Sequence, residues 1–400
     1  GHLPHAHQLG AVAVGASLYI FLAWMMGFLR MGTTGFAAQA AGRGDGTALR
    51  QILVQGLLLG LGLSLFLAAI ALPFSRVALS VMQPSPELHD MTLAFFHNRL
   101  FGLPASLASY ALVGWFLGAQ NARAPLAILL TTNLMNIALN LWFVLGLDWG
   151  VVGSARASVI AEWSGALLGL WLTRGALRAY PGKMAWAALR VWQNWKPLLG
   201  VNRDIFIRSL LLQSVFFAIT VQGARLGDAT VAANALLLNG LLLTAHALDG
   251  LAHAVEALCG HAIGARDRTA LRRSMVVACG WSLLASALFA LLFLLGGHWF
   301  VEMQTDIASV RETAFQYLPY LAVLPLIAVW SYLLDGLFIG ATRAREMRNA
   351  MLLSVAIAFP VAWALQGDGN HGLWISFLLF MVLRSGILGL YATRIRWFTP

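Results

Sequence analysis

The chain has 400 residues, of which 60% are hydrophobic and only 10% charged, and its mean hydropathy is +0.76. Because ordinary soluble proteins carry about 25% charged residues, this composition excludes a soluble globular protein and indicates an integral membrane protein. The formal net charge of +10 would suit a nucleic-acid partner. The placement of the basic residues is instead typical of a membrane topology, so we expect no nucleic-acid binding.

Eleven apolar segments are long enough to cross a bilayer. They are continuously apolar and lack the alternation of barrel strands, which predicts helices. The predicted spans are 8–36, 48–72, 91–119, 125–147, 151–174, 197–224, 229–262, 270–297, 309–341, 347–366 and 371–394.

The basic residues alternate between the two sides of this predicted topology. Eighteen lie in alternate connections, whereas the opposite connections hold only Arg76 and Arg225. Cytoplasmic loops carry an excess of Lys and Arg, so the C-terminus at Pro400 is predicted to be cytoplasmic and Gly1 to lie outside.

An internal repeat divides the chain into two halves. The segment Tyr110–Ala119 recurs at Tyr332–Ala341, and Gly42–Arg50 recurs at Gly264–Arg272, both at an offset of 222. Both copies of the basic loop lie on one side, which indicates parallel repeats related by an axis along the membrane normal. The predicted fold is therefore an all-α membrane protein of two six-helix bundles. We expect an N-terminal lobe at 1–178, a cytoplasmic linker at 179–196 and a C-terminal lobe at 197–400.

The first predicted lobe contains five of its six helices. At the offset of 222, Gly1 aligns with Gly223, at the end of the span 197–224. We therefore expect one further transmembrane helix before Gly1.

The stretch 228–261 carries polar side chains along one helical face. An acid at the bilayer centre costs about 2.5–3.5 kcal/mol, so such groups normally face a bundle interior or a cavity. An acid beside an imidazole can pass a proton near neutral pH. We therefore predict a cavity-lining stripe, with a structural polar seam as the alternative; its members are Asn239, His246, Asp249, His253 and Glu256.

Other polar side chains within the spans are further candidates. In the first half these are Asn133, Asn136, Asn140 and Ser158, with Glu162 as a secondary candidate. Amides of this kind bind an ion or only hold helices together. In the second half, Asp335 either shares the interior of Glu256 or pairs with a cation such as Arg208 or Arg384.

Several stretches make the chain similar to the multidrug and toxic compound extrusion (MATE) transporters, specifically the DinF-like branch. They include Leu29–Ala40, Gly118–Pro125, Gly200–Gln213, Leu248–Gly260 and Leu334–Asn349. The resemblance implies two six-helix lobes arranged as a V and export of organic compounds against inward H⁺ or Na⁺. It also implies an ion site at Asn136 and Asn140, where similar transporters often have an aspartate at the second position, together with an acid on the first helix.

The leading interpretation is thus a bacterial inner-membrane secondary antiporter that exports hydrophobic or cationic compounds. We expect a monomer that uses no cofactor beyond the coupling ion, H⁺ or Na⁺. No nucleotide-binding loop, HExxH motif or zinc-ligand spacing occurs, so an enzyme is not expected. The alternative is a flippase for lipid-linked precursors, which would be expected to have a strongly cationic central cavity.

Overall fold

The computed structural model describes residues 6–82, 85–395 and 397, and the regular structure of these residues is helical, without strands. The chain divides into two compact units, Gly1–Leu199 and Gly200–Pro400. Each predicted span corresponds to a helical segment, when a helix that is broken over two residues is counted as one. The predicted all-α, repeated architecture is therefore confirmed.

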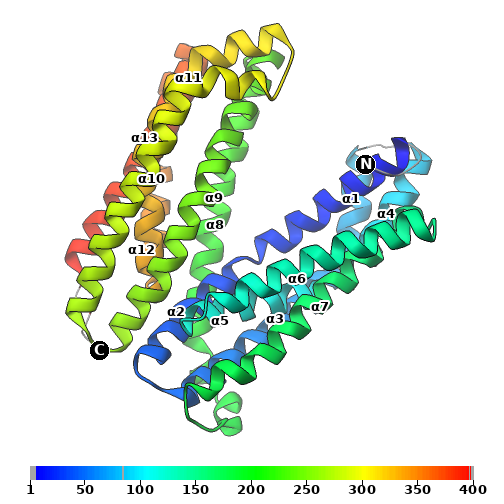
Figure 1. Cartoon of the computed structure of the whole chain (residues 1–400). Helices are drawn as coiled ribbons and strands as arrows, with labels where there is room; N and C mark the ends of the chain where they lie inside the picture. The colour runs from blue at the N-terminus through cyan, green and yellow to red at the C-terminus, as the bar shows by residue number, and fades with distance from the viewer. Residues whose placement is uncertain (1–5, 83–84, 396, 398–400) are drawn as a thin grey trace. The chain divides into compact units, whose positions relative to one another are not determined.

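The first unit contains two spans that are each broken into a pair of helices. The breaks fall at Met26–Gly27 and at Phe101–Gly102, and the second pair is bent by 47°. Helix α6 ends in a π-helical turn, Leu141–Gly146. The helices, coloured blue to green in Figure 1, are α1 (Ala6–Met25), α2 (Phe28–Gly42), α3 (Gly46–Met82), α4 (Pro86–Leu100), α5 (Leu103–Gly118), α6 (Arg123–Asn140) and α7 (Gly150–Arg178).

The described spans of the second unit are each a single unbroken helix. Both Pro319 and Pro325 lie inside α11, which runs through them as one helix. A short 3₁₀ turn, η4 (Leu365–Asp368), joins the last two helices. The helices, coloured green to red in Figure 1, are α8 (Lys196–Arg225), α9 (Asp228–Gly264), α10 (Arg268–Glu302), α11 (Ala308–Gly340), α12 (Ala344–Ala364) and α13 (Gly369–Arg394).

The segment between α7 and α8 is held against the first unit. The Arg50 guanidinium donates hydrogen bonds to the carbonyls of Leu177 at 3.2 Å and Tyr180 at 2.8 Å. The Gln55 amide donates to the carbonyl of Asn194 at 3.0 Å. These contacts attach the predicted linker to α3.

The internal repeat is visible in the helix bounds. The broken span from Ala6 to Gly42 corresponds to α9, and the broken span from Pro86 to Gly118 corresponds to α11, with both ends offset by 222 residues. Asp45 and Asp267 each cap the following helix through a hydrogen bond of 2.9 Å to a backbone N–H three residues on. The two halves therefore share loops as well as helices.

Repeat-related glycines allow two helices to meet at the same place in each unit. A Cβ atom at Gly114 of α5 would lie 2.2 Å from the carbonyl oxygen of Arg30 on α2. A Cβ atom at Gly336 of α11 would lie 2.6 Å from the carbonyl oxygen of Ala252 on α9. Both the glycines and their partners are 222 residues apart, so this close packing of two helices is equivalent in the two units. Small residues permit this approach in membrane helices.

The helices have the length and apolar character needed to cross a membrane. Eight segments satisfy both requirements, and the bent pair α4–α5 makes a ninth. Helices α12 and α13 count together as one of the eight, and α7 is not among them. The chain is a multi-pass membrane protein.

Candidate functional site

The amides predicted in the first unit form a contiguous polar group on α6 and α7. The Asn136 side-chain amide donates a hydrogen bond of 2.8 Å to the Ser158 hydroxyl. The Asn140 amide donates to the Asn136 carbonyl at 2.8 Å and to its side-chain oxygen at 3.2 Å. The structure brings these three residues together, whereas Asn133 is exposed and away from these contacts. The group supplies neutral oxygens and no carboxylate.

A carboxylate lies one helical turn further along α7. Glu162 accepts two parallel hydrogen bonds from Arg99 of α4, at 2.9 and 3.0 Å. The Arg99 guanidinium carbon lies 3.9 Å from the centre of the Tyr19 ring on α1, and the Tyr19 hydroxyl is 2.9 Å from that of Ser106. Arg99 is only 8% exposed. Bidentate pairs of this kind are among the strongest charged contacts in proteins, so the group joins α1, α4, α5 and α7.

The break between α4 and α5 makes room for this carboxylate. A Cβ atom at Gly102 would lie 2.0 Å from a Glu162 carboxylate oxygen. The next residue but one, Pro104, lacks an N–H and suits the first turn of α5. The bend thus places the Glu162 carboxylate directly against the backbone at Gly102, where the side chain of any larger residue would exclude it.

Asp335 occupies the interior of the second unit, at 5% exposure on α11. One of its oxygens, Oδ2, accepts hydrogen bonds from Arg208 of α8, at 2.6 Å, and from Arg384 of α13. The alternative in which Asp335 pairs with a cationic neighbour is therefore confirmed, and it pairs with both arginines that the sequence offered. These three residues are called the Asp335 cluster.

The polar stripe of α9 divides between different environments. Asn239 is exposed and its amide donates to the side chain of Gln304, beyond the end of α10, at 3.0 Å. His246 is exposed, with Nδ1 2.7 Å from a carbonyl of its own helix. Asp249 and His253 are half-buried, and Glu256 is 2% exposed. The structure therefore does not gather the five residues into one site.

Asp249, in the middle of the stripe, acts on the same tyrosine as the Asp335 cluster. Asp249, Asp335, Arg208 and Arg384 all act electrostatically on the Tyr332 hydroxyl of α11. This shared influence places Asp249 in the same electrostatic neighbourhood as the cluster.

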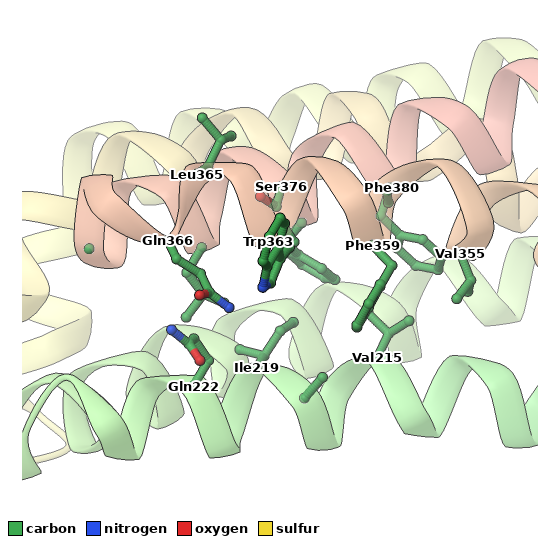
Figure 2. A pocket seen from close by; sticks show the side chains of 16 residues that line it. Val215, Ile219, Gln222, Val355, Phe359, Trp363, Leu365, Gln366, Ser376 and Phe380 are labelled. Carbon is green, nitrogen blue, oxygen red and sulfur yellow. The ribbon is translucent and has the colours of Figure 1, made fainter.

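A pocket of about 170 Å³ lies inside the second unit, between α8, α12 and α13. Its walls are mainly apolar and include Ile219, Phe359, Trp363 and Phe380. Figure 2 shows the side chains of Gln222 and Gln366 pointing toward each other at one end, with Phe380 toward the other end. Ligand sites are typically concave and apolar, with a few polar groups that orient the ligand.

Near the N-terminus of α8, another ion pair holds this helix to α12. Arg348 donates a hydrogen bond of 2.8 Å to Asp204, whose side chain is buried. With the Arg208–Asp335 pair, it gives α8 two charged attachments within its first four turns. The pocket begins beyond both of them.

The sequence did not predict the pairing of Arg99 with Glu162, nor the pocket. Arg99 and Glu162 each lie in an apolar segment, and because burying a single charge is costly, their presence there indicated that each needs a partner. The pocket had no such signal, because its glutamines lie on segments 144 residues apart in the sequence.

The fold consists of two repeated helical bundles, with buried acids that form ion pairs and with an apolar pocket. This combination is typical of membrane transporters built from repeats. The family model described as MatE matches residues 1–142 and 205–364. The chain belongs to the MatE family, the multidrug and toxic compound extrusion transporters, whose members are transporters and not enzymes.

The chain is 44% identical to DNA damage-inducible protein F of Escherichia coli over 387 residues, covering 96% of this chain and 84% of that protein. It is 27% identical to a probable multidrug resistance protein NorM of Xanthomonas axonopodis, covering 96% of this chain and 85% of the relative. A solved structure described as MATE in the bent conformation aligns with a TM-score of 0.87 at 17% identity, covering 98% of this chain and 88% of that one. The predicted membership of the DinF-like branch is confirmed.

Proposed function

We propose that this chain is a secondary active antiporter that exports hydrophobic organic compounds in exchange for H⁺ or Na⁺. The observation that carries the proposal is the pocket between α8, α12 and α13, which has the mainly apolar lining and the few polar groups of a small-molecule site. Its few polar groups, Gln222, Gln366 and Ser376, can orient a ligand without restricting it to one compound. The relatives named for multidrug resistance support this assignment.

The coupling ion is proposed to act in the first unit, through Glu162 and the adjacent amides. Glu162 follows Ser158 by four residues on α7 and therefore lies on the same helical face. It supplies the carboxylate that Asn136 and Asn140 lack. Protonation of Glu162 would remove the counter-charge of Arg99 and weaken the contact between α4 and α7, which links ion binding to helix movement.

The polar and acidic residues of the second unit are not proposed to carry the coupling ion. Asp335 is held by two arginines, which oppose the binding of a further cation. On α9, Asp249, His253 and Glu256 remain proposed cavity-lining residues. Asn239 and His246, at the exposed end of this polar stripe, remain candidates for binding substrate or ion. We place Pro400 in the cytoplasm on the distribution of basic residues. The bacterial inner membrane is proposed on the similarity to the Escherichia coli relative, and a monomer is proposed as the working unit.

The test is transport in everted membrane vesicles with an imposed ΔpH or ΔpNa, followed with a fluorescent hydrophobic compound. Uptake driven by one gradient and abolished by its collapse is expected. Glu162→Gln should reduce this uptake at least tenfold while the protein remains in the membrane, and Glu312→Gln, the same substitution at an exposed glutamate of α11, serves as the control. Substrate movement with neither gradient would contradict antiport and favour facilitated flipping. Unchanged uptake in Glu162→Gln would exclude this residue from coupling.

A further inference from the structure

We propose that Gln222 and Gln366 bind an uncharged hydrogen-bonding group, such as a carboxamide, on an aromatic compound whose body occupies the pocket between α8, α12 and α13. This inference rests on the proposed function, because it names the substrate class of the same pocket. It narrows the expected substrates from hydrophobic or cationic compounds to uncharged ones, and it makes the two glutamines the residues that determine specificity.

The lining of the pocket offers no charge to an ion. The sixteen lining residues that the structure describes include no ionisable side chain. An ion that leaves water for such a pocket loses its hydration without gaining a counter-charge, whereas an uncharged polar group requires only hydrogen bonds. An uncharged ligand is therefore favoured over both an organic cation and an organic anion.

The charged residues around the pocket occur in sets of opposite sign. Arg225 and Asp368 follow the two glutamines by three and two residues, and both are exposed. The Asp335 cluster and Asp249 comprise two arginines and two acids, which act together on one tyrosine of α11. None of these residues lines the pocket. Their charges balance and give an ion of either sign no net attraction.

The two glutamines supply hydrogen-bonding groups that the protein itself does not use. Figure 2 shows their side chains pointing toward each other at one end of the pocket, one from α8 and one from η4. Neither side-chain amide forms a hydrogen bond with another described residue, although Gln222 is half-buried. The third polar residue of the lining, Ser376, donates its hydroxyl to the carbonyl of Gly372 at 2.6 Å. The two amides are therefore the groups left to orient a ligand.

Two facing amides suit a ligand group that both donates and accepts. Each glutamine side chain has an oxygen acceptor and an NH₂ donor. A carboxamide on the ligand can accept a hydrogen bond from one glutamine and donate one to the other. A carboxylate or an ammonium group can bond to the same amides, but its charge stays unmatched in the pocket.

The aromatic side chains of the lining indicate the body of the ligand. Phe359 and Trp363 of α12 are 67% and 70% exposed, and Figure 2 shows Trp363 between Gln366 and Phe359. Exposed rings favour a flat aromatic ligand, which can stack on them. The same rings can attract a cation through their π faces, so an organic cation is the competing ligand in the test.

The experiment compares four naphthyl ligands of matched shape. The amide, 2-naphthylacetamide, is uncharged and both donates and accepts; the methyl ester of 2-naphthylacetate is uncharged and only accepts. The two ions are 2-naphthylacetate and 2-(2-naphthyl)ethylammonium. Dissociation constants are measured by calorimetry at neutral pH on the full chain in nanodiscs of a zwitterionic lipid, with no ion gradient and with empty nanodiscs as the reference. The unsubstituted protein should bind the amide about tenfold more tightly than either ion, which equals about 1.4 kcal/mol.

The variants remove the hydrogen-bonding groups and retain the approximate size of the side chain. Gln222→Leu should weaken binding of the amide about tenfold and binding of the ester by much less, so that the two affinities become similar. Gln366→Leu should have a smaller effect, because water competes for its exposed side chain. Gln213→Leu makes the same substitution at a half-buried glutamine of α8 outside the lining, and this matched control should retain the preference for the amide.

Binding of the ammonium ion or of the carboxylate as tightly as the amide by the unsubstituted protein would overturn the proposal. An equal loss of amide and ester binding in Gln222→Leu would also overturn it, because the glutamine would then only maintain the pocket. So would the same loss of preference in Gln213→Leu.

The inference and the proposed function can fail separately. Selective binding of the amide by a protein that moves no substrate under either gradient would contradict the proposed function and leave this inference standing. Gradient-driven export of the naphthyl compounds without preference for the amide would do the reverse.

Discussion

The two units place different sets of charged groups beside equivalent tyrosines. Tyr110 on α5 and Tyr332 on α11 are related by the offset of 222. Glu162, on the last helix of the first unit, acts electrostatically on Tyr110. Arg384, on the last helix of the second unit, has its guanidinium carbon 5.9 Å from the centre of the Tyr332 ring. The repeat thus retains the helix packing and the tyrosine, while the charged groups around the tyrosine differ between the units.

The two groups also differ in how completely their charges are paired. Arg99 and Glu162 form one bidentate pair with no net charge. In the second unit Asp335 accepts hydrogen bonds from two arginines through one oxygen, and Asp249 acts electrostatically in the same neighbourhood. The first unit therefore pairs one acid with one arginine, whereas Asp335 is shared between two. The packing frame is therefore common to both units, and the charges give each unit its own chemistry.

The largest expected effect on stability follows from removing Arg99, the cation of the Arg99–Glu162 pair. Arg99→Met leaves Glu162 buried without its partner, which should lower the free energy of unfolding by about 3–5 kcal/mol. The loss is measured as a decrease in the melting temperature of the purified protein in detergent. Arg99→Met/Glu162→Met removes both charges and should recover most of it. A single variant as stable as the unsubstituted protein would show that the pair does not hold the helices.

The next effect concerns the packing that the two units share. Gly114→Ala and Gly336→Ala each place a methyl group against backbone carbonyl oxygens, at 2.2 and 2.6 Å. Such overpacking should cost about 1–3 kcal/mol in each unit. Gly250→Ala, in α9, meets no atom within 4 Å and is the matched control. A loss in only one of the two variants would contradict the equivalence of the helix packing.

The smallest effect is expected at the Asp335 cluster. Arg384→Met leaves Asp335 paired with Arg208. We expect the free energy of unfolding to change by no more than about 1 kcal/mol, in contrast to the cost of about 3–5 kcal/mol for a buried charge that loses its only partner. The comparison is made by melting temperature under the same conditions as for Arg99→Met. A loss as large as that of Arg99→Met would indicate that both arginines are structural.

The sequence determined the helical segments, the repeat and the family. Hydrophobic length predicts a span because the bilayer requires about 20 apolar residues, and this holds whatever the helix packs against. The repeat could be recognised in the sequence for a related reason. Gly114 and Gly336 lie where the backbones of two helices touch, and no larger residue fits there. It also provided a short list of partners for Asp335, both of which the structure confirms.

Only the tertiary structure decided which buried charges meet. Periodicity places Asn136 and Asn140 on one face of α6, but it does not say which helix that face contacts. Glu162 and Arg99 are 63 residues apart, and their pairing depends on the bend at Gly102 and on the rotation of α7 about its axis. The stripe of α9 shows the same limit, since side chains on one helical face reached different neighbours along its length. Helical spacing is a local property, whereas the pairing of charges depends on how whole helices pack.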